Sequence, residues 1–311
     1  MGTRARQSGI AIIMVLWLTI MLTVIASGFA FSMRSEALSA RNALSLAQAR
    51  TAADGGIERL AFELTRPRMA ASWTADGVEH AWKDGDVSVT GSAVDESARI
   101  DVNSAPEALL RGLIEHVGGT DQETAARITD AIQDWRDADE LRRPNGAEAA
   151  DYQSAGLKQK PSNAPFETVS EVSRVMGVTP AIYARISDSL TVHSRQPGIN
   201  AMLASRDVLL ALPAATPELV DAYLQQRADA RASKLPIPPF PAAASFVAGA
   251  VPVWHIRTAA TAPDGVTFVR EAVVRPSGDP RRPLLTLNWR EGNMVAAPVA
   301  IAGTPAAEAR K

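Results

Sequence analysis

The sequence contains no cysteine, few aromatic residues and only four histidines among its 311 residues. Without cysteine the chain can form no disulfide bond, no cysteine-ligated zinc site and no thiol nucleophile. The histidines, at positions 80, 116, 193 and 255, show no metal-ligand spacing, and no nucleophile elbow, P-loop or dinucleotide fingerprint is present. We therefore expect a chain that is not an enzyme and whose fold depends on core burial.

The chain also lacks an excess of positive charge. Its net charge is −2 at pH 7 and its pI is about 6.1, which gives no electrostatic attraction to nucleic acid. The length is enough for roughly two domains. We expect no nucleic-acid partner.

What the sequence does contain is one long uncharged apolar run, residues 10–31, IAIIMVLWLTIMLTVIASGFAF. Its length matches the roughly 20 residues that a helix needs to cross a bilayer. Arg4 and Arg6 precede the run, while Arg34 beyond it is balanced by Glu36, so the N-terminus is expected in the cytoplasm and the rest across the membrane. Two alternatives stay open: a secretory signal peptide cleaved after Ala30, and a plain uncleaved anchor.

The helical pattern continues beyond the apolar run. Between residues 38 and 64, apolar side chains recur at near-helical spacing, with charged and amide residues on the rest of the surface. No helix breaker occurs before Pro67, and Gly55-Gly56 is the one soft point. We predict one helix from about Ile10 to Leu64, roughly 80 Å long, with its lower half in lipid and its upper half packed on a domain.

Strand patterns lie on both sides of a long helical middle. Residues 78–82 and 86–94 flank a Lys-Asp-Gly turn, and residues 251–260 and 266–274 flank a Pro-Asp-Gly turn, so each pair predicts a hairpin. Residues 284–289 are a further strand candidate, and residues 99–102 add a short one. Strands before and after the helices predict one antiparallel sheet with an insertion.

The middle of the chain favours short helices over residues 106–117, 122–137, 166–176, 180–189 and 217–230, with polar residues placed to cap them. Asn103-Ser104, Thr179 and Thr216 are among the expected caps. Three similar Asn-containing turns, each before a short helix, resemble helix-hairpin-helix or SAM-like units. Such units often bind the DNA backbone, but the turns here lack basic residues to neutralise phosphates.

The N-terminal run RQSGIAIIMVLWLTIMLTVIASGFAFSMRSEALSARNALSLAQARTAADGGIERL resembles the type IV pilin-like proteins, and most of all the K-type minor pseudopilins of type II secretion systems. The resemblance implies that a prepilin peptidase cuts after Gly9 and methylates Ile10. It also implies a pilin-like domain with a large helical insertion. The implied partners are the I- and J-type minor pseudopilins, the major pseudopilin and the peptidase.

Met14 is the clearest departure from pilins in general. Most pilin-like proteins have a glutamate five residues into the mature chain, and that position is Met14 here. A carboxylate in lipid is costly unless it is paired, and in pilins the implied partner is the terminal amine of the neighbouring subunit. A subunit at the filament tip has no earlier neighbour and needs no carboxylate. The alternative is drift in a subunit that no longer assembles.

One acidic segment could carry ion chemistry. Asp134, Asp137 and Asp139 precede a Pro-Asn-Gly turn that brings the chain back to Glu148 and Asp151. Such oxygen ligands on a loop suit Ca²⁺, although the spacing is not that of an EF-hand. The alternative is a solvated acidic loop neutralised by arginines at 136, 142 and 143. K-type relatives carry calcium in the matching region, but alanines at 149 and 150 stand where acidic residues are common, which leaves a lost or weaker site open.

Taken together, we predict an α+β fold: a long N-terminal transmembrane and amphipathic helix on an antiparallel, pilin-like sheet, with an inserted all-helical SAM-like or helix-hairpin-helix-like domain. The expected parts are a leader (1–9), a transmembrane helix (10–31), its extension (32–66), the first sheet part (67–102), the insertion (103–197), a helical pair with a proline-rich connector (198–250), the last strands (251–290) and a disordered tail (291–311).

The function predicted from these features is that of a minor pseudopilin at the tip of a type II secretion pseudopilus. Such a subunit would sit in the inner membrane by a single pass, with its bulk in the periplasm, and would initiate or cap assembly for export of folded proteins. The alternative is a membrane-anchored periplasmic binding module, with a role in DNA uptake as one variant, that is not part of a pseudopilus.

Overall fold

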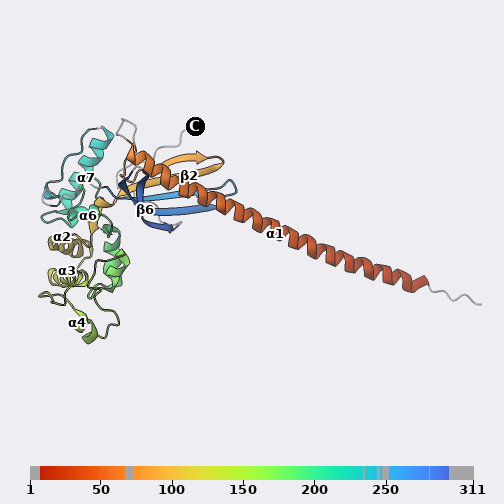
Figure 1. The fold of residues 1–311 in the computed structure, drawn as a ribbon, viewed down its shortest axis with the longest axis horizontal. Helices are drawn as coiled ribbons and strands as arrows, with labels where there is room; N and C mark the ends of the chain where they lie inside the picture. Colours follow the sequence, from red (N-terminus) through yellow and green to blue (C-terminus); the bar gives the residue numbers. More distant parts are fainter. Residues whose placement is uncertain are drawn as a thin grey trace, which may run out of the picture.

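The computed structural model describes residues 8–66, 73–233, 235–243, 246, 252–279 and 281–293. One helix, α1 (Ser8–Thr65), holds 58 of them and projects far beyond the rest of the molecule (Figure 1). At 1.5 Å per residue it is roughly 87 Å long, so the prediction of one unbroken helix through the Gly55-Gly56 pair is confirmed. The predicted leader, apart from Ser8 and Gly9, and the tail from residue 294 lie outside the described residues.

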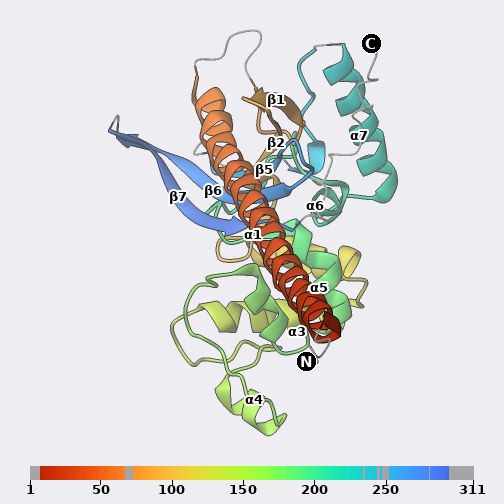
Figure 2. The same cartoon turned by 90° about the vertical axis from the view of Figure 1, so that its right-hand side faces the viewer.

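The sheet region consists of the upper part of α1 and five antiparallel strands. The strands are β1 (His80–Asp84), β2 (Val87–Asp95), β5 (Trp254–Thr261), β6 (Thr267–Asp279) and β7 (Arg282–Glu291). Their order is β1-β2-β5-β6-β7, and Figure 2 shows α1 crossing the sheet with β1 and β7 at its two edges. Because β2 pairs with β5, the intervening chain is an insertion into one sheet, as predicted.

Helix α1 packs closely on the sheet because the residues between them are small. Its buried face includes Ala49, Ala52, Ala53 and Ala61, which are 0–4% exposed. A Cβ on Gly91 of β2 would fall only 2.6 Å from a Leu60 methyl, so glycine at this position leaves room for the Leu60 side chain. Larger side chains on this face would push the helix away from the strands.

Polar contacts also fix α1 on the sheet. Thr258 of β5 donates its hydroxyl to the Ala53 carbonyl at 2.8 Å, and Arg270 of β6 pairs with Asp54 at 2.5 Å. Ser45 donates to Asp264 at the tip of the β5–β6 hairpin, 2.5 Å away. Ser45 is the first buried residue of the helix, so α1 leaves the sheet at this contact and is exposed below it.

The helical region comprises the described residues from 96 to 246. Its elements are η1 (Glu96–Ala98), β3 (Ile100–Asp101), α2 (Glu107–Gly112), η2 (Leu113–Val117), α3 (Gln122–Arg136), α4 (Ala149–Ser154), η3 (Val169–Arg174), α5 (Pro180–Ile186), η4 (Ser187–Ser189), β4 (Leu190–Thr191), α6 (Arg206–Leu210), α7 (Pro217–Ala232) and η5 (Pro241–Ala243). One apolar cluster of leucine, isoleucine, valine and aromatic side chains joins them.

Two details of the sequence prediction are wrong here. The strand near residue 100 does not join the pilin-like sheet, because β3 pairs in parallel with β4 inside the insertion, which is therefore not all-helical. Asn103 does not cap α2, whose N-cap is Pro106 without a side-chain bond. Asn103 instead accepts from the Phe166 amide at 2.8 Å and donates to its carbonyl at 2.9 Å. The caps at Thr179 and Thr216 are confirmed.

Candidate metal centre and domain junction

The predicted processing and assembly residues lie at the free end of α1. Gly9 is within the helix, and the side chains of Ile10 and Met14 are 66% and 68% exposed. Cleavage after Gly9 and methylation of Ile10 stay predictions.

Helix α1 is also the candidate membrane span. Within Ile10–Thr65 an 18-residue window has a mean hydropathy of 2.6, and none of that window is buried inside the protein. A core helix of a soluble protein would hide such a stretch, whereas this one contacts no other described element. The length and composition therefore support a single-pass anchor.

The acidic segment is organised by two carboxylates one turn apart on α3. Asp130 accepts from the backbone and side-chain amides of Asn145 at 3.1 and 3.0 Å. Asp134, which is fully buried, accepts from the Arg143 amide at 3.3 Å. Gly146 lies so close that a Cβ would fall 1.9 Å from the Asp134 carboxylate, so the loop needs glycine there. Asp130 was not predicted as part of this segment.

Glu148 is the least satisfied acid in the molecule's described part. It is only 6% exposed, and apart from its capping-box contact with the Asp151 amide neither of its carboxylate oxygens has a hydrogen-bond partner. Burial, followed by the carboxylates of Asp134 and Asp137, raises the pKa of Glu148 to about 7. Asp137 resembles it, because its Oδ1 is buried without a partner and burial raises the pKa of its carboxyl.

The other two predicted ligands have different partners. Asp151 accepts from the Glu148 amide at 2.9 Å, pairs with Arg142 at 3.0 Å and has a lowered pKa because of these bonds. The exposed Asp139 accepts from the Leu141 amide at 2.8 Å. Neither carboxylate is therefore held ready for a metal in this arrangement.

The three nearby arginines divide between two roles. Arg143 lies 3.4 Å from Asp134 and 3.6 Å from Asp137, and Arg142 pairs with Asp151. Arg136 instead donates to the backbone carbonyls of Val102 and Ala105. Across the residues that the structure describes, no three His, Asp or Glu side chains are placed to hold a metal ion. The carboxylate oxygens of Asp134, Asp137 and Glu148 are of the kind that a hard cation prefers. In this structure Arg143 occupies the position beside Asp134 and Asp137 that such a cation would take.

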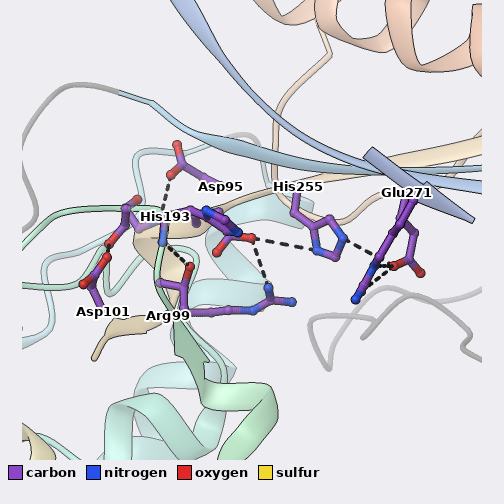
Figure 3. Close-up of polar contacts among 11 residues, drawn as sticks. Asp95, Arg99, Asp101, His193, His255 and Glu271 are labelled. Carbon is purple, nitrogen blue, oxygen red and sulfur yellow. Dashed lines mark hydrogen bonds and ion pairs between the residues drawn. The ribbon is translucent and has the colours of Figure 1, made fainter. Parts of the chain in front are cut away.

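A second polar cluster joins the sheet to the helical region (Figure 3). His255 of β5 has its Nδ1 3.8 Å from the buried Glu96 and its Nε2 3.8 Å from Glu271 of β6. Arg99 pairs with Glu96 at 3.1 Å, and Arg290 pairs with Glu271 at 2.6 Å. His255 and Arg290 together lower the pKa of Glu271 to about 2.

The residues that follow β4 complete this polar cluster on the side of the helical region. His193 follows β4 and faces Glu96 and Asp101, and burial lowers its pKa. Asp101 is fully buried and accepts from the Arg195 amide at 2.7 Å and from the Ser194 hydroxyl at 3.3 Å. The sequence shows His193 and His255 as scattered residues, because only the fold brings segments so far apart in the chain together.

Comparison with known proteins shows which family the chain resembles. The family model described as "Type II secretion system (T2SS), protein K" matches residues 92–197. The type II secretion system protein K of Klebsiella pneumoniae is 28% identical over 232 residues, which cover 66% of this chain and 70% of that protein. The chain is thus similar to the type II secretion system protein K family over its sheet junction and helical region.

A further relative and a solved structure show the same similarity. The protein K of Pseudomonas aeruginosa is 27% identical over 246 residues, covering 70% of this chain and 73% of that protein. Among solved structures, a chain of the GspK-GspI-GspJ complex from enterotoxigenic Escherichia coli matches with a TM-score of 0.56 and 15% identity. The match covers 84% of this chain and 99% of that one. This likeness supports the pilin-like fold with its insertion.

Proposed function

We propose that this chain, a minor pseudopilin of the protein K family, occupies the tip of a type II secretion pseudopilus. The observation that carries the proposal is the position of the helical region. It lies at the end of the molecule opposite the free N-terminal half of α1 (Figure 1). In a filament built from packed N-terminal helices, bulk at that end leaves no surface on which another subunit could stack.

The N-terminal half of α1 supports the same position. Every residue from 10 to 44 is exposed, so this stretch has its whole surface free for lipid and for neighbouring helices. Met14 brings no carboxylate into the bilayer, and a buried charge there would need a partner. A subunit with no earlier neighbour has no such partner, which suits the first position in the filament.

The proposed partners are the I- and J-type minor pseudopilins, the major pseudopilin and the prepilin peptidase. The solved structure with the matching fold is a complex of GspK with GspI and GspJ, which makes the first two the strongest candidates. We place the chain in the inner membrane with a cytoplasmic N-terminus and a periplasmic bulk, as the charges around the span predict.

The processing step is tested by intact-mass measurement of the full chain extracted from membranes, with and without a prepilin peptidase. A mature chain that starts at N-methylated Ile10, seen only with the peptidase, is expected. A start at Phe31 would indicate a signal peptide, and an intact Met1 a plain anchor. Either of those results would contradict membership of the filament.

The tip position is tested by electron microscopy of overproduced pseudopili with a gold-labelled epitope in the helical region. Label at one end of each filament is the expected result. Label along the length would contradict the tip position. A chain that remains monomeric with every pseudopilin would instead favour a membrane-anchored binding module.

We also propose that the acidic loop binds calcium through Asp134, Asp137 and Glu148. The support is the set of buried oxygens without partners on Asp137 and Glu148 and the raised pKa of all three carboxyls, to which burial contributes most. Calcium prefers such oxygen ligands and would neutralise their mutual repulsion. It would have to displace Arg143, which contacts two of the three, and draw the carboxylates together, because the described structure does not place them around one metal.

The calcium proposal is tested by thermal unfolding of the full chain in nanodiscs, with calcium or with chelator. Calcium is expected to raise the Tm of the wild type and to leave the Tm of Glu148→Gln and Asp137→Asn unchanged. Glu123→Gln is the matched control, because that side chain on α3 is 84% exposed and its loss should preserve the calcium effect. An unchanged wild-type Tm, or an effect that survives in Glu148→Gln, would contradict the proposal.

A further inference from the structure

A pocket of about 180 Å³ opens beside the junction, where the returning chain meets the sheet. His193 and Arg195 line it from the helical region, and Arg275 and Leu287 line it from β6 and β7. Three of these four side chains are basic, and no acidic residue lines the pocket. A concave site of this size takes one small group of a ligand.

The two arginines of the pocket have no counterion among the described residues. Neither Arg195 nor Arg275 forms an ion pair within the described part of the chain, and the Nε of Arg275 is buried without a hydrogen-bond acceptor. An unsatisfied buried donor on a charged group is costly, and such groups are normally paired. An acceptor brought by a ligand would remove this cost.

The fold holds Arg195 at the pocket by a strained backbone. Its φ is +52°, a left-handed conformation that is unfavourable for a side chain other than glycine. The Asp101 carboxylate accepts the Arg195 amide at 2.7 Å and so stabilises this conformation. Asp101 is a positioning residue here, because its own lone pairs face the backbone and the Ser194 hydroxyl.

The carboxylates behind the pocket do not cancel its charge. Glu96 is matched by Arg99 and His255, and Asp101 accepts from the amides of Asn103, Ser104 and Arg195. No ion pair joins either carboxylate to Arg275 among the described residues. The opening of the pocket is therefore cationic, and it is suited to a carboxylate, which a guanidinium binds through charge-assisted hydrogen bonds.

The pocket adjoins the open edge of the sheet. Strand β7 is ten residues long and pairs only with β6 among the described strands. Leu285 and Leu287 on it are 43% and 37% exposed, and Leu287 reaches the pocket. The other edge strand, β1, has five residues, with Lys83 and Asp84 at its end. A long edge with exposed leucines is the kind that pairs with an added strand.

We propose that the β7 edge and the adjoining pocket form a docking surface for an extended polypeptide segment of a partner protein that carries an acidic side chain. The segment adds a strand to β7, its apolar residues cover Leu285 and Leu287, and its carboxylate enters the pocket between Arg195 and Arg275. The inference does not depend on calcium or on the tip position, since it rests on the unpaired edge and the unmatched arginines.

The test uses the full chain in nanodiscs and two fluorescent capped peptides of alternating valine and threonine. One has a central aspartate and the other an asparagine in its place. By fluorescence anisotropy the aspartate peptide is expected to bind about tenfold more tightly, which corresponds to about 1.4 kcal/mol. Arg275→Gln is expected to abolish the difference, and the preference should weaken as salt increases.

The matched control is Arg127→Gln, which removes a 57%-exposed cation on α3 far from the pocket in sequence and should leave the preference intact. Arg195→Gln, at an exposed side chain, gives a second variant if Arg275→Gln fails to fold. Equal binding of both peptides would overturn the assignment of the pocket to a carboxylate. Binding of neither peptide, or a preference that persists in Arg195→Gln, would overturn the docking surface.

Discussion

In the sheet region, α1 lies so close to the strands that its buried face consists mostly of small residues, alanine above all, whereas the helical region buries leucine, isoleucine and aromatic side chains in one cluster. The first arrangement joins residues more than two hundred positions apart, such as Thr258 and Ala53. The second joins short helices, some adjacent in sequence, such as α6 and α7, and others up to about ninety positions apart, such as η2 and α6. The stability of the sheet region therefore depends on the close approach of α1 to the strands, and that of the helical region depends on how well large side chains fill its core.

The largest expected effect is in the helical core. Trp135 is 3% exposed and stacks on Phe166, with ring centroids 5.9 Å apart. Trp135→Ala should destabilise the helical region by about 3–5 kcal/mol, because it leaves a large cavity. Hydrogen exchange read by mass spectrometry should show lost protection in α2 and α3 but not in β5 and β6. Equal loss in both regions would show that they unfold as one unit.

A somewhat smaller effect is expected where α1 crosses the sheet. Leu60 is 1% exposed and faces Gly91, so Leu60→Ala should cost about 2–4 kcal/mol and loosen β2 and β5 first. Phe62→Ala, two residues along the same helix but 62% exposed, is the control and should change stability by no more than about 0.5 kcal/mol. The same exchange experiment measures both, and similar losses would refute the one-sided packing of α1.

The two regions should also respond to pH in opposite directions. The folded-state pKa of Glu148, about 7, lies above its ordinary value of 4.5. Its stabilising contribution is therefore complete below pH 4.5 and is lost as the pH rises to 7. In chelator, Glu148→Gln should melt at a higher temperature than the wild type at pH 8, and the two should converge at pH 4.5. A constant difference across that range would exclude the buried-carboxylate explanation.

The pH dependence of stability expected from Glu271, in the sheet region, has the opposite sign. Its folded-state pKa, about 2, lies below 4.5, so its stabilising contribution is present above pH 4.5 and is lost as the pH falls toward 2. Glu271→Gln should therefore lower the Tm at pH 7 and have little effect near pH 2. Calorimetry across this range measures the difference, and a Tm deficit that grows with acidity would show that the ion pairs of Glu271 are not its cause.

The smallest expected effect concerns the two adjacent glycines of α1. A Cβ on Gly55 meets nothing within 4 Å, whereas one on Gly56 would lie 3.0 Å from Thr258. Gly55→Ala should stabilise the helix by about 1 kcal/mol, and Gly56→Ala should gain less or lose stability. Denaturant unfolding of the two variants compares them directly. An equal gain would mean that the helix and the sheet are not in close contact at this point.

Much of the fold could be predicted from local patterns. The unbroken helix followed from the absence of a breaker before Pro67, and both hairpins followed from their turn residues. Thr179 and Thr216 were recognisable as caps because a capping hydroxyl acts on amides only two or three residues away. The acidic segment was also visible, but not the division of its carboxylates between Arg142, Arg143 and the loop amides.

Features that depend on neighbours along the chain could be predicted from the sequence: the length of α1, the turns, the caps and the apolar residues available for burial. Which distant groups come into contact depends on the tertiary fold. It paired β3 with β4 instead of the sheet, assigned Asn103 to Phe166, and brought His193, Glu96 and His255 to one junction. These contacts depend on how the sheet region and the helical region pack against each other. A periodic pattern or a residue spacing reports only on neighbours along the chain, so it cannot give the distance between segments that are far apart in sequence.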